Sequence, residues 1–185
     1  MIEDRADDWG PLSDLPGNPM MWLLILSELG IFGAFFVGYG IAYALNPVVF
    51  AQSQAMLDPW LGGINTIILV TSGLLAALAL AARRGGHSGR AALLATIILG
   101  AVFLAVKAVE YAPKVAAGIG PETNTFFALY YLLTGFHALH VVFGIVILGI
   151  VAWKNSVANL ETGTAFWHML DMIWVIMYPL LYLLR

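Results

Sequence analysis

Six side chains suited to proton or metal chemistry, and one polar amide, lie within long apolar stretches of this sequence. They are Glu28, Asn65, Glu110, His137, His140, His168 and Asp171. Histidine and carboxylate groups can carry protons or bind a metal ion. Polar groups are costly at membrane depth, so they normally face a protein interior, a partner or a cavity. These seven are therefore the candidate site residues.

Two of them, His137 and His140, lie near the middle of the uncharged stretch 126–153. They are three residues apart and share one helical face, and His168 and Asp171 repeat that spacing further along the chain. Asp171 can accept a hydrogen bond from His168 or from a histidine of the preceding stretch. Carboxylate metal sites in helix bundles use Glu-x-x-His motifs, which this sequence lacks. We expect no metal-binding, heme-binding, cofactor-binding or catalytic residues, and instead polar groups that satisfy one another across helices.

The two glutamates and the asparagine fit the same expectation. Glu28 is predicted to be either protonated through desolvation or paired, with a neighbouring helix or with a lipid ammonium group. A proton-carrying role for Glu28 is the alternative. Glu110 is three residues from Lys107, so the two can pair, although Lys107 can also extend to the membrane interface. Asn65 adds a further polar group at modest depth.

The composition predicts an integral membrane protein. Of the 185 residues, 61% are hydrophobic and 10% are charged, whereas soluble domains are roughly 45–50% apolar and about 25% charged. The mean hydropathy is +0.89. There are no cysteines, so disulfides and thiolate metal sites are excluded. The net charge of −3 and the absence of a basic run argue against nucleic acid as a partner.

Five apolar stretches are long enough to cross about 30 Å of hydrocarbon, which takes roughly 20 residues each. They cover residues of about 20–45, 60–82, 91–111, 124–153 and 164–184. Short connections between them favour antiparallel neighbours in one bundle. The fold class is therefore all-α integral membrane, a bundle of five transmembrane helices in a single domain over 20–185. Residues 1–19 are acidic and rich in Pro and Gly, which indicates a short arm outside the membrane.

Loop charges predict the orientation. Five basic residues fall on the side of the N-terminus: Arg5, Arg83, Arg84, Arg90 and Lys154. Lys114 and Arg185 fall on the other side. The positive-inside rule then places the N-terminus in the cytoplasm and the C-terminus outside. We expect a multi-pass protein of a bacterial inner membrane.

Small and aromatic residues suggest packing and depth. The glycines expected to pack helices together are Gly30, Gly33, Gly38, Gly40, Gly135, Gly144 and Gly149, with contact to a partner subunit as the alternative. The tryptophans expected as interfacial anchors are Trp60, Trp153 and Trp167.

Five motifs, one on each stretch and in a fixed order, resemble subunit III of the heme–copper terminal oxidases. They are SELGIFGAFF around Glu28, INTIILVTSG around Asn65, VKAVEYAP around Glu110, NTFFALYYLLTGFHALHVVFG around His137 and His140, and FWHMLDMIWVIMYPLLYLL around His168 and Asp171. The resemblance covers about 160 residues. It is to the short five-helix form, which includes subunits of cytochrome c and quinol oxidases and proteins associated with nitric oxide reductases. Lys107 departs from the family pattern.

The resemblance implies a subunit without heme or metal of its own, beside a catalytic subunit I that reduces oxygen and pumps protons. It implies structural or lipid-proximal roles for the seven candidate residues, and structural phospholipids between the helices. Two alternatives stay open at this stage. One is an accessory subunit of a nitric oxide reductase, and the other is an independent small transporter or membrane enzyme.

Overall fold

The computed structural model describes residues 19–154 and 156–184, and all of its regular elements are helices. Five helices are long and apolar enough to cross a membrane. The prediction of an all-α bundle of five transmembrane helices is confirmed. The acidic arm predicted over 1–19 lies outside the described residues, apart from Pro19 at the start of the first helix.

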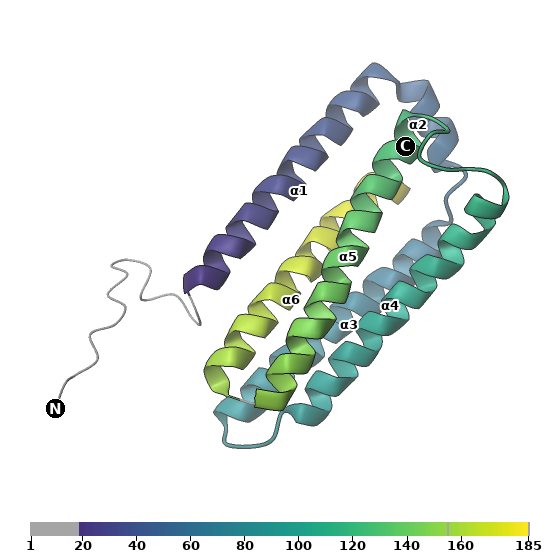
Figure 1. Ribbon diagram of the computed structural model, residues 1–185. Helices are drawn as coiled ribbons and strands as arrows, with labels where there is room; N and C mark the ends of the chain where they lie inside the picture. Colours follow the sequence, from purple (N-terminus) through teal and green to yellow (C-terminus); the bar gives the residue numbers. More distant parts are fainter. Residues whose placement is uncertain (1–18, 155, 185) are drawn as a thin grey trace.

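Four of the long helices form a ring in which each packs against its neighbours (Figure 1). They are α3 (Pro59–Arg84), α4 (Arg90–Ala116), α5 (Thr125–Lys154) and α6 (Val157–Tyr178). Helices α3 and α4 are joined by a five-residue turn in which Gly86 adopts a φ of 80°, a left-handed conformation that favours glycine. Trp167 lies inside the ring, and Cβ atoms added to Gly100 and Gly144 would come within 2.6 and 2.9 Å of its indole ring.

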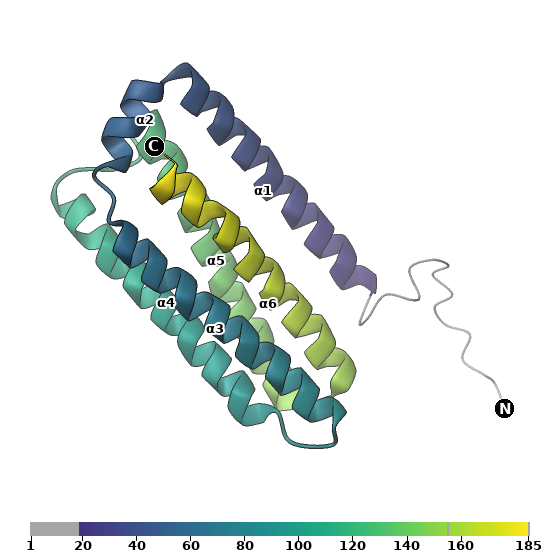
Figure 2. The same ribbon diagram turned by 180° about the vertical axis from the view of Figure 1, so that it is seen from behind.

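Helix α1 (Pro19–Leu45) lies along one flank of the ring, against α5 and α6 (Figures 1 and 2). Its buried residues Ile25, Phe32 and Tyr39 recur every seven positions and form one narrow seam. Only 11% of its most apolar segment is buried in the chain, compared with 56% for the last span. Most of α1 is therefore left to face lipid or a partner.

The loop predicted between the first two spans contains a short helix, α2 (Pro47–Gln54). Pro47 suits a first helical turn because its missing N–H has no partner there in any case. The buried Gln54 amide donates to the carbonyl oxygens of Leu180 and Leu181, each at 3.3 Å. These carbonyls belong to a π-helical turn, η2 (Pro179–Leu183), which ends the last span.

Two helix boundaries differ from the predicted ones. Helix α6 begins at Val157 rather than near residue 164, because the Ser156 hydroxyl accepts from the backbone N–H of Asn159 and caps the helix. Its first turns are only moderately apolar, so hydropathy located the span but not the start of the helix. Helix α4 continues through Pro113 to Ala116, beyond the predicted end near residue 111.

The predicted roles of the small and aromatic residues are only partly correct. Internal packing is confirmed for Gly144 but is wrong for the others. A Cβ at any of these would have no described atom within 4 Å: Gly30, Gly33, Gly38, Gly40, Gly135 and Gly149. Trp60 and Trp153 are more than 80% exposed, but Trp167 is fully buried and is not an interfacial anchor.

Candidate functional site

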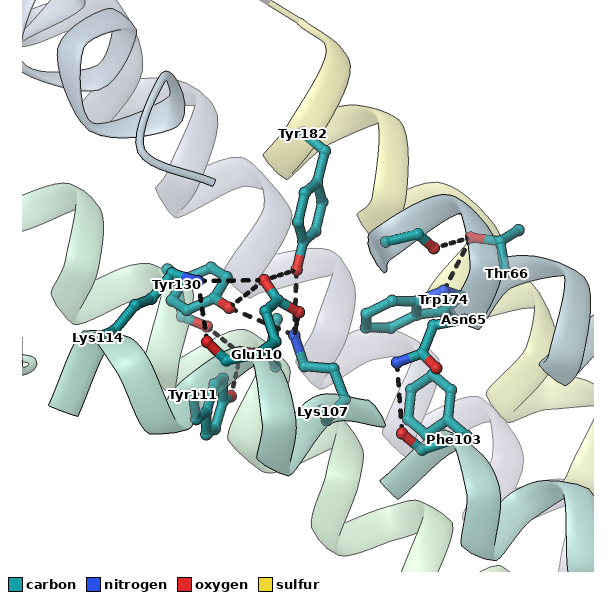
Figure 3. Close-up of polar contacts among 12 residues, drawn as sticks. Asn65, Thr66, Phe103, Lys107, Glu110, Tyr111, Lys114, Tyr130, Trp174 and Tyr182 are labelled. Carbon is teal, nitrogen blue, oxygen red and sulfur yellow. Dashed lines mark hydrogen bonds and ion pairs between the residues drawn. The ribbon is translucent and has the colours of Figure 1, made fainter. Parts of the chain in front are cut away.

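The largest buried polar cluster surrounds the carboxylate of Glu110 on α4 (Figure 3). The Lys107 ammonium donates to Glu110 Oε2 at 2.8 Å, and the phenols of Tyr130 and Tyr182 each donate to Oε1 at 2.7 Å. Lys114 Nζ lies 3.6 Å from Oε1 and donates to the Glu110 backbone carbonyl. Residues from α4, α5 and η2 thus meet at one carboxylate, which joins these three elements.

The ammonium group of Lys107 is held inside the protein rather than extended to the interface. Its side chain is 4% exposed. Besides Glu110, it contacts the faces of four aromatic rings, at 5.0 to 5.8 Å from their centroids: Tyr111, Tyr130, Trp174 and Tyr182. An ammonium in such an aromatic cage is stabilised by both the carboxylate and the ring faces.

His137 lies deeper in the ring, in an aromatic pocket. Its ring centroid is 5.3 Å from that of Trp174, 5.6 Å from that of Phe103 and 6.4 Å from that of Phe32. The side chain is fully buried, and neither ring nitrogen has a hydrogen-bond partner among the described residues. His137 therefore contributes packing between α1, α4, α5 and α6.

Asn65 on α3 is buried near the same aromatic residues (Figure 3). Its side-chain amide donates to the Phe103 carbonyl at 3.3 Å. The Trp174 indole N–H donates to the hydroxyl of Thr66 at 3.0 Å. These bonds connect α3 to α4 and to α6 through neutral groups.

Glu28 and His140 provide a polar contact between α1 and α5. Their Oε2 and Nε2 atoms are 3.1 Å apart, and the two side chains are only 15% and 13% exposed. His140 Nδ1 lies 2.8 Å from the Phe136 carbonyl, which can only accept, so Nδ1 donates there. Attraction between Nε2 and the Glu28 carboxyl group then requires a proton on one of them.

His168 and Asp171 form the fourth grouping, on the side of α6 that faces α3. His168 Nδ1 lies 3.4 Å from Asp171 Oδ2. The Asp171 carboxyl group lies against Gly73, where a Cβ would come within 2.1 Å of Oδ2. The His168 side chain is 46% exposed, so this pair is open where the Glu110 cluster is closed. The span predicted over 164–184 would place both residues in its first two turns, but α6 starts at Val157, so they lie more than two turns from its start.

The structure thus distributes the seven candidate residues over separate groupings instead of one network. Two of them reach α5, through Glu110 with Tyr130 and through Glu28 with His140. Three residues of the Glu110 cluster were not predicted from the sequence: Lys114, Tyr130 and Tyr182. The two tyrosines could have been predicted to take part in a buried polar contact, since a buried O–H normally has a hydrogen-bond partner. Over the described ranges, no group of three or more His, Asp or Glu residues is arranged to hold a metal ion.

The architecture and these groupings define a multi-pass helical membrane protein whose ionisable groups lie mostly between helices. Comparison with known families makes this more specific. The model of the family described as cytochrome c oxidase subunit III matches residues 18–184, almost the whole sequence. The chain belongs to this family, and the resemblance seen in its five motifs is confirmed.

Individual relatives agree with the assignment. Cytochrome c oxidase subunit 3 of Synechocystis is 31% identical, over 88% of this chain and 73% of the relative. Heme-copper oxidase subunit I+III of Aeropyrum pernix is 33% identical, over 88% of this chain and 22% of that longer protein. Cytochrome bo(3) ubiquinol oxidase subunit 3 of Pseudomonas aeruginosa is 26% identical, over 98% of this chain and 89% of the relative.

Proposed function

We propose that this chain is the non-catalytic subunit III of a respiratory heme–copper oxidase. In this role it stabilises the catalytic subunit I and supports oxygen reduction and proton uptake there. Heme and metal ions belong to the partner, and this chain contributes a rigid helical surface in the membrane.

The observation that carries the proposal is the enclosure of the Glu110 carboxylate by hydrogen-bond donors. Three donors from three elements converge on its carboxylate, and the group is 1% exposed. A carboxylate so enclosed is committed to holding α4, α5 and η2 together, and no substrate can reach it without opening the bundle. The chemistry of the interior is thus that of a scaffold.

The partner is supported by a relative. The Aeropyrum pernix protein is named subunit I+III, so the counterpart of this chain there is continuous with a subunit I. Segments that are fused in one organism and separate in another usually occupy the same complex. A catalytic subunit I is therefore the partner we assign to this chain.

Membrane placement follows from charge and surface. Arg84, Arg90 and Lys154 lie at the helix ends on one side of the bundle, which we assign to the cytoplasm of a bacterial cell. A hollow of about 350 Å³ on the outer face of α5, lined by Leu139, His140 and Val142 among others, is mostly apolar. It suits an acyl chain, which supports a structural phospholipid beside the Glu28–His140 contact.

Mild-detergent purification of the tagged chain from its native membranes tests the proposal. We expect a heme-bearing membrane protein to co-purify, with copper in the preparation and with oxygen consumption. Removal of this chain from the complex should leave the heme spectrum in place but lower the number of turnovers before inactivation.

Three results would contradict the proposal. A chain that migrates alone from gently solubilised membranes has no such partner. A partner that consumes nitric oxide at a heme/non-heme iron centre and holds no copper would place the chain with the nitric oxide reductases. Transport or catalysis by the isolated chain in liposomes would show an independent function.

A further inference from the structure

Helices α3 and α6 lie side by side (Figure 2). A groove runs along the face that they share. It consists of two adjoining hollows, of about 370 and 430 Å³, which share Ala77 and His168 in their linings. One end of it carries the ion pair between Arg84 and Glu161, at 2.9 Å. The other end is apolar except for His168 and Asp171.

The position of the groove along the membrane normal follows from helix geometry. A helix rises 1.5 Å per residue, so His168 lies about 10 Å further along α6 than Glu161. By the same rise, Asp171 lies about 15 Å beyond Glu161, and Gly73 lies about 16 Å from Arg84 along α3. Asp171 lies against Gly73, so these two distances from the ion pair, one along each helix, reach the same depth. If the ion pair marks the membrane surface, this level is near the middle of a hydrocarbon layer about 30 Å thick.

His168 is therefore a polar side chain that is nearly half exposed where lipid tails would otherwise surround it. Such a group is costly in hydrocarbon and normally meets a polar partner. Its Nδ1 faces Asp171 Oδ2, which accepts a hydrogen bond when Nδ1 carries the ring proton. In a neutral imidazole with Nδ1 as the donor, Nε2 is an acceptor. The groove thus presents a hydrogen-bond acceptor at membrane depth, fixed in direction by Asp171.

The walls of the groove allow a close approach. Ala77 on α3 is small and exposed, and small residues let the backbone of another helix come near. A phospholipid headgroup stays at the interface, about 10 Å or more from His168, so only its tails would reach this level. Tails would leave Nε2 without a donor, whereas a transmembrane helix can supply one.

We propose that this groove is the docking surface for a transmembrane helix of the partner subunit, which donates an N–H or O–H to His168. The inference rests on the proposed function, because it takes the catalytic subunit as the partner. Asp171 acts through His168 as a positioning residue.

The test compares two alanines that are both exposed on the bundle surface. Ala77→Trp fills the groove from α3, and Ala101→Trp adds the same bulk to the outer face of α4. Each variant is expressed in the native complex, and heme and phospholipid are measured per tagged chain after mild-detergent purification. We expect Ala77→Trp to lower the heme ratio about tenfold, since overpacking costs about 1–3 kcal/mol. Ala101→Trp should leave it unchanged.

A second pair tests the hydrogen bond and remains informative if Ala77→Trp fails to fold. His168→Leu removes the acceptor and should lower the heme ratio about threefold, the typical effect of one interhelical hydrogen bond in a membrane. His168→Gln keeps a side-chain acceptor and should retain most of the partner. Melting of the purified chain is measured alongside, because a purely structural role would lower it in parallel.

The outcomes separate the two proposals. If the wild-type chain brings down no heme-bearing partner, the proposed function fails. If it does, but Ala77→Trp behaves like Ala101→Trp, or His168→Leu like His168→Gln, then only the docking surface is wrong. A loss of phospholipid with full retention of heme would assign the groove to lipid and would also overturn the inference.

Discussion

Two ionisable pairs with the same spacing lie in opposite surroundings. Lys107 and Glu110 are three residues apart on α4, with side chains 4% and 1% exposed. His168 and Asp171 are three residues apart on α6, with side chains 46% and 12% exposed. Each pair combines a base with a carboxylate on one helical face, so the pairs themselves do not explain the difference.

What differs is the contribution of the neighbouring helices. Around Glu110 they supply two phenols, Tyr130 and Tyr182, which complete the hydrogen bonds of the carboxylate and exclude solvent. Beside His168 they supply Gly73 and Ala77, which leave a groove. The closed pair serves to hold the bundle together, and the open pair is suited to a contact with another molecule.

The largest expected effect is at the closed pair. Glu110→Leu would leave Lys107 and two phenols without their carboxylate acceptor, and breaking a buried ion pair in this way costs about 3–5 kcal/mol. We expect the free energy of unfolding, measured by titration with sodium dodecyl sulfate, to fall by about that amount. Glu122→Leu, in the exposed loop nearby, should change it by less than about 0.5 kcal/mol. Equal effects of the two substitutions would show that the Glu110 cluster does not stabilise the packing of α4, α5 and η2.

Substitutions at two glycines should also distinguish the closed from the open region. A Cβ at Gly100 would come within 2.6 Å of the indole of Trp167, which is buried and unable to move, so Gly100→Ala should cost about 1–3 kcal/mol. A Cβ at Gly73 would meet Asp171 Oδ2, the free end of a side chain beside a groove. Gly73→Ala should therefore change stability by less than about 0.5 kcal/mol. It should instead displace Asp171 from His168 and reduce partner retention. The same titration measures the stability of both variants, and the heme ratio measures their retention of the partner. A larger loss of stability in Gly73→Ala than in Gly100→Ala would contradict the comparison.

The sequence was sufficient for part of this comparison. Hydropathy located the five spans, because a transmembrane helix needs a long apolar run whatever it packs against. Helical spacing indicated that Lys107 can pair with Glu110, and the two do so. Both inferences depend on local geometry, which is the same in any helix.

The rest depends on how the helices are rotated and ordered. Glu28 meets His140 from more than a hundred residues away, and Tyr182 reaches Glu110 from the end of the chain. No spacing rule gives such partners. The open character of His168 was hidden for the same reason, because it depends on which side of α6 faces α3. The start of α6 was also missed, since the cap at Ser156 lies outside the apolar run.

The contact between Glu28 and His140 is intermediate between the two regions and should respond least. Its side chains are 15% and 13% exposed, and it joins the bundle to the helix with the least buried surface. Glu28→Gln retains a side chain that can hydrogen-bond to His140, so we expect unfolding in sodium dodecyl sulfate to shift by about 0.5 kcal/mol or less. Glu28→Leu leaves the imidazole without that partner and should cost about 1–2 kcal/mol. Proton uptake by the complex distinguishes a structural from a proton-carrying Glu28, because an amide cannot carry a proton. We expect uptake in Glu28→Gln to match wild type, and its loss at unchanged stability would assign proton transfer to this residue.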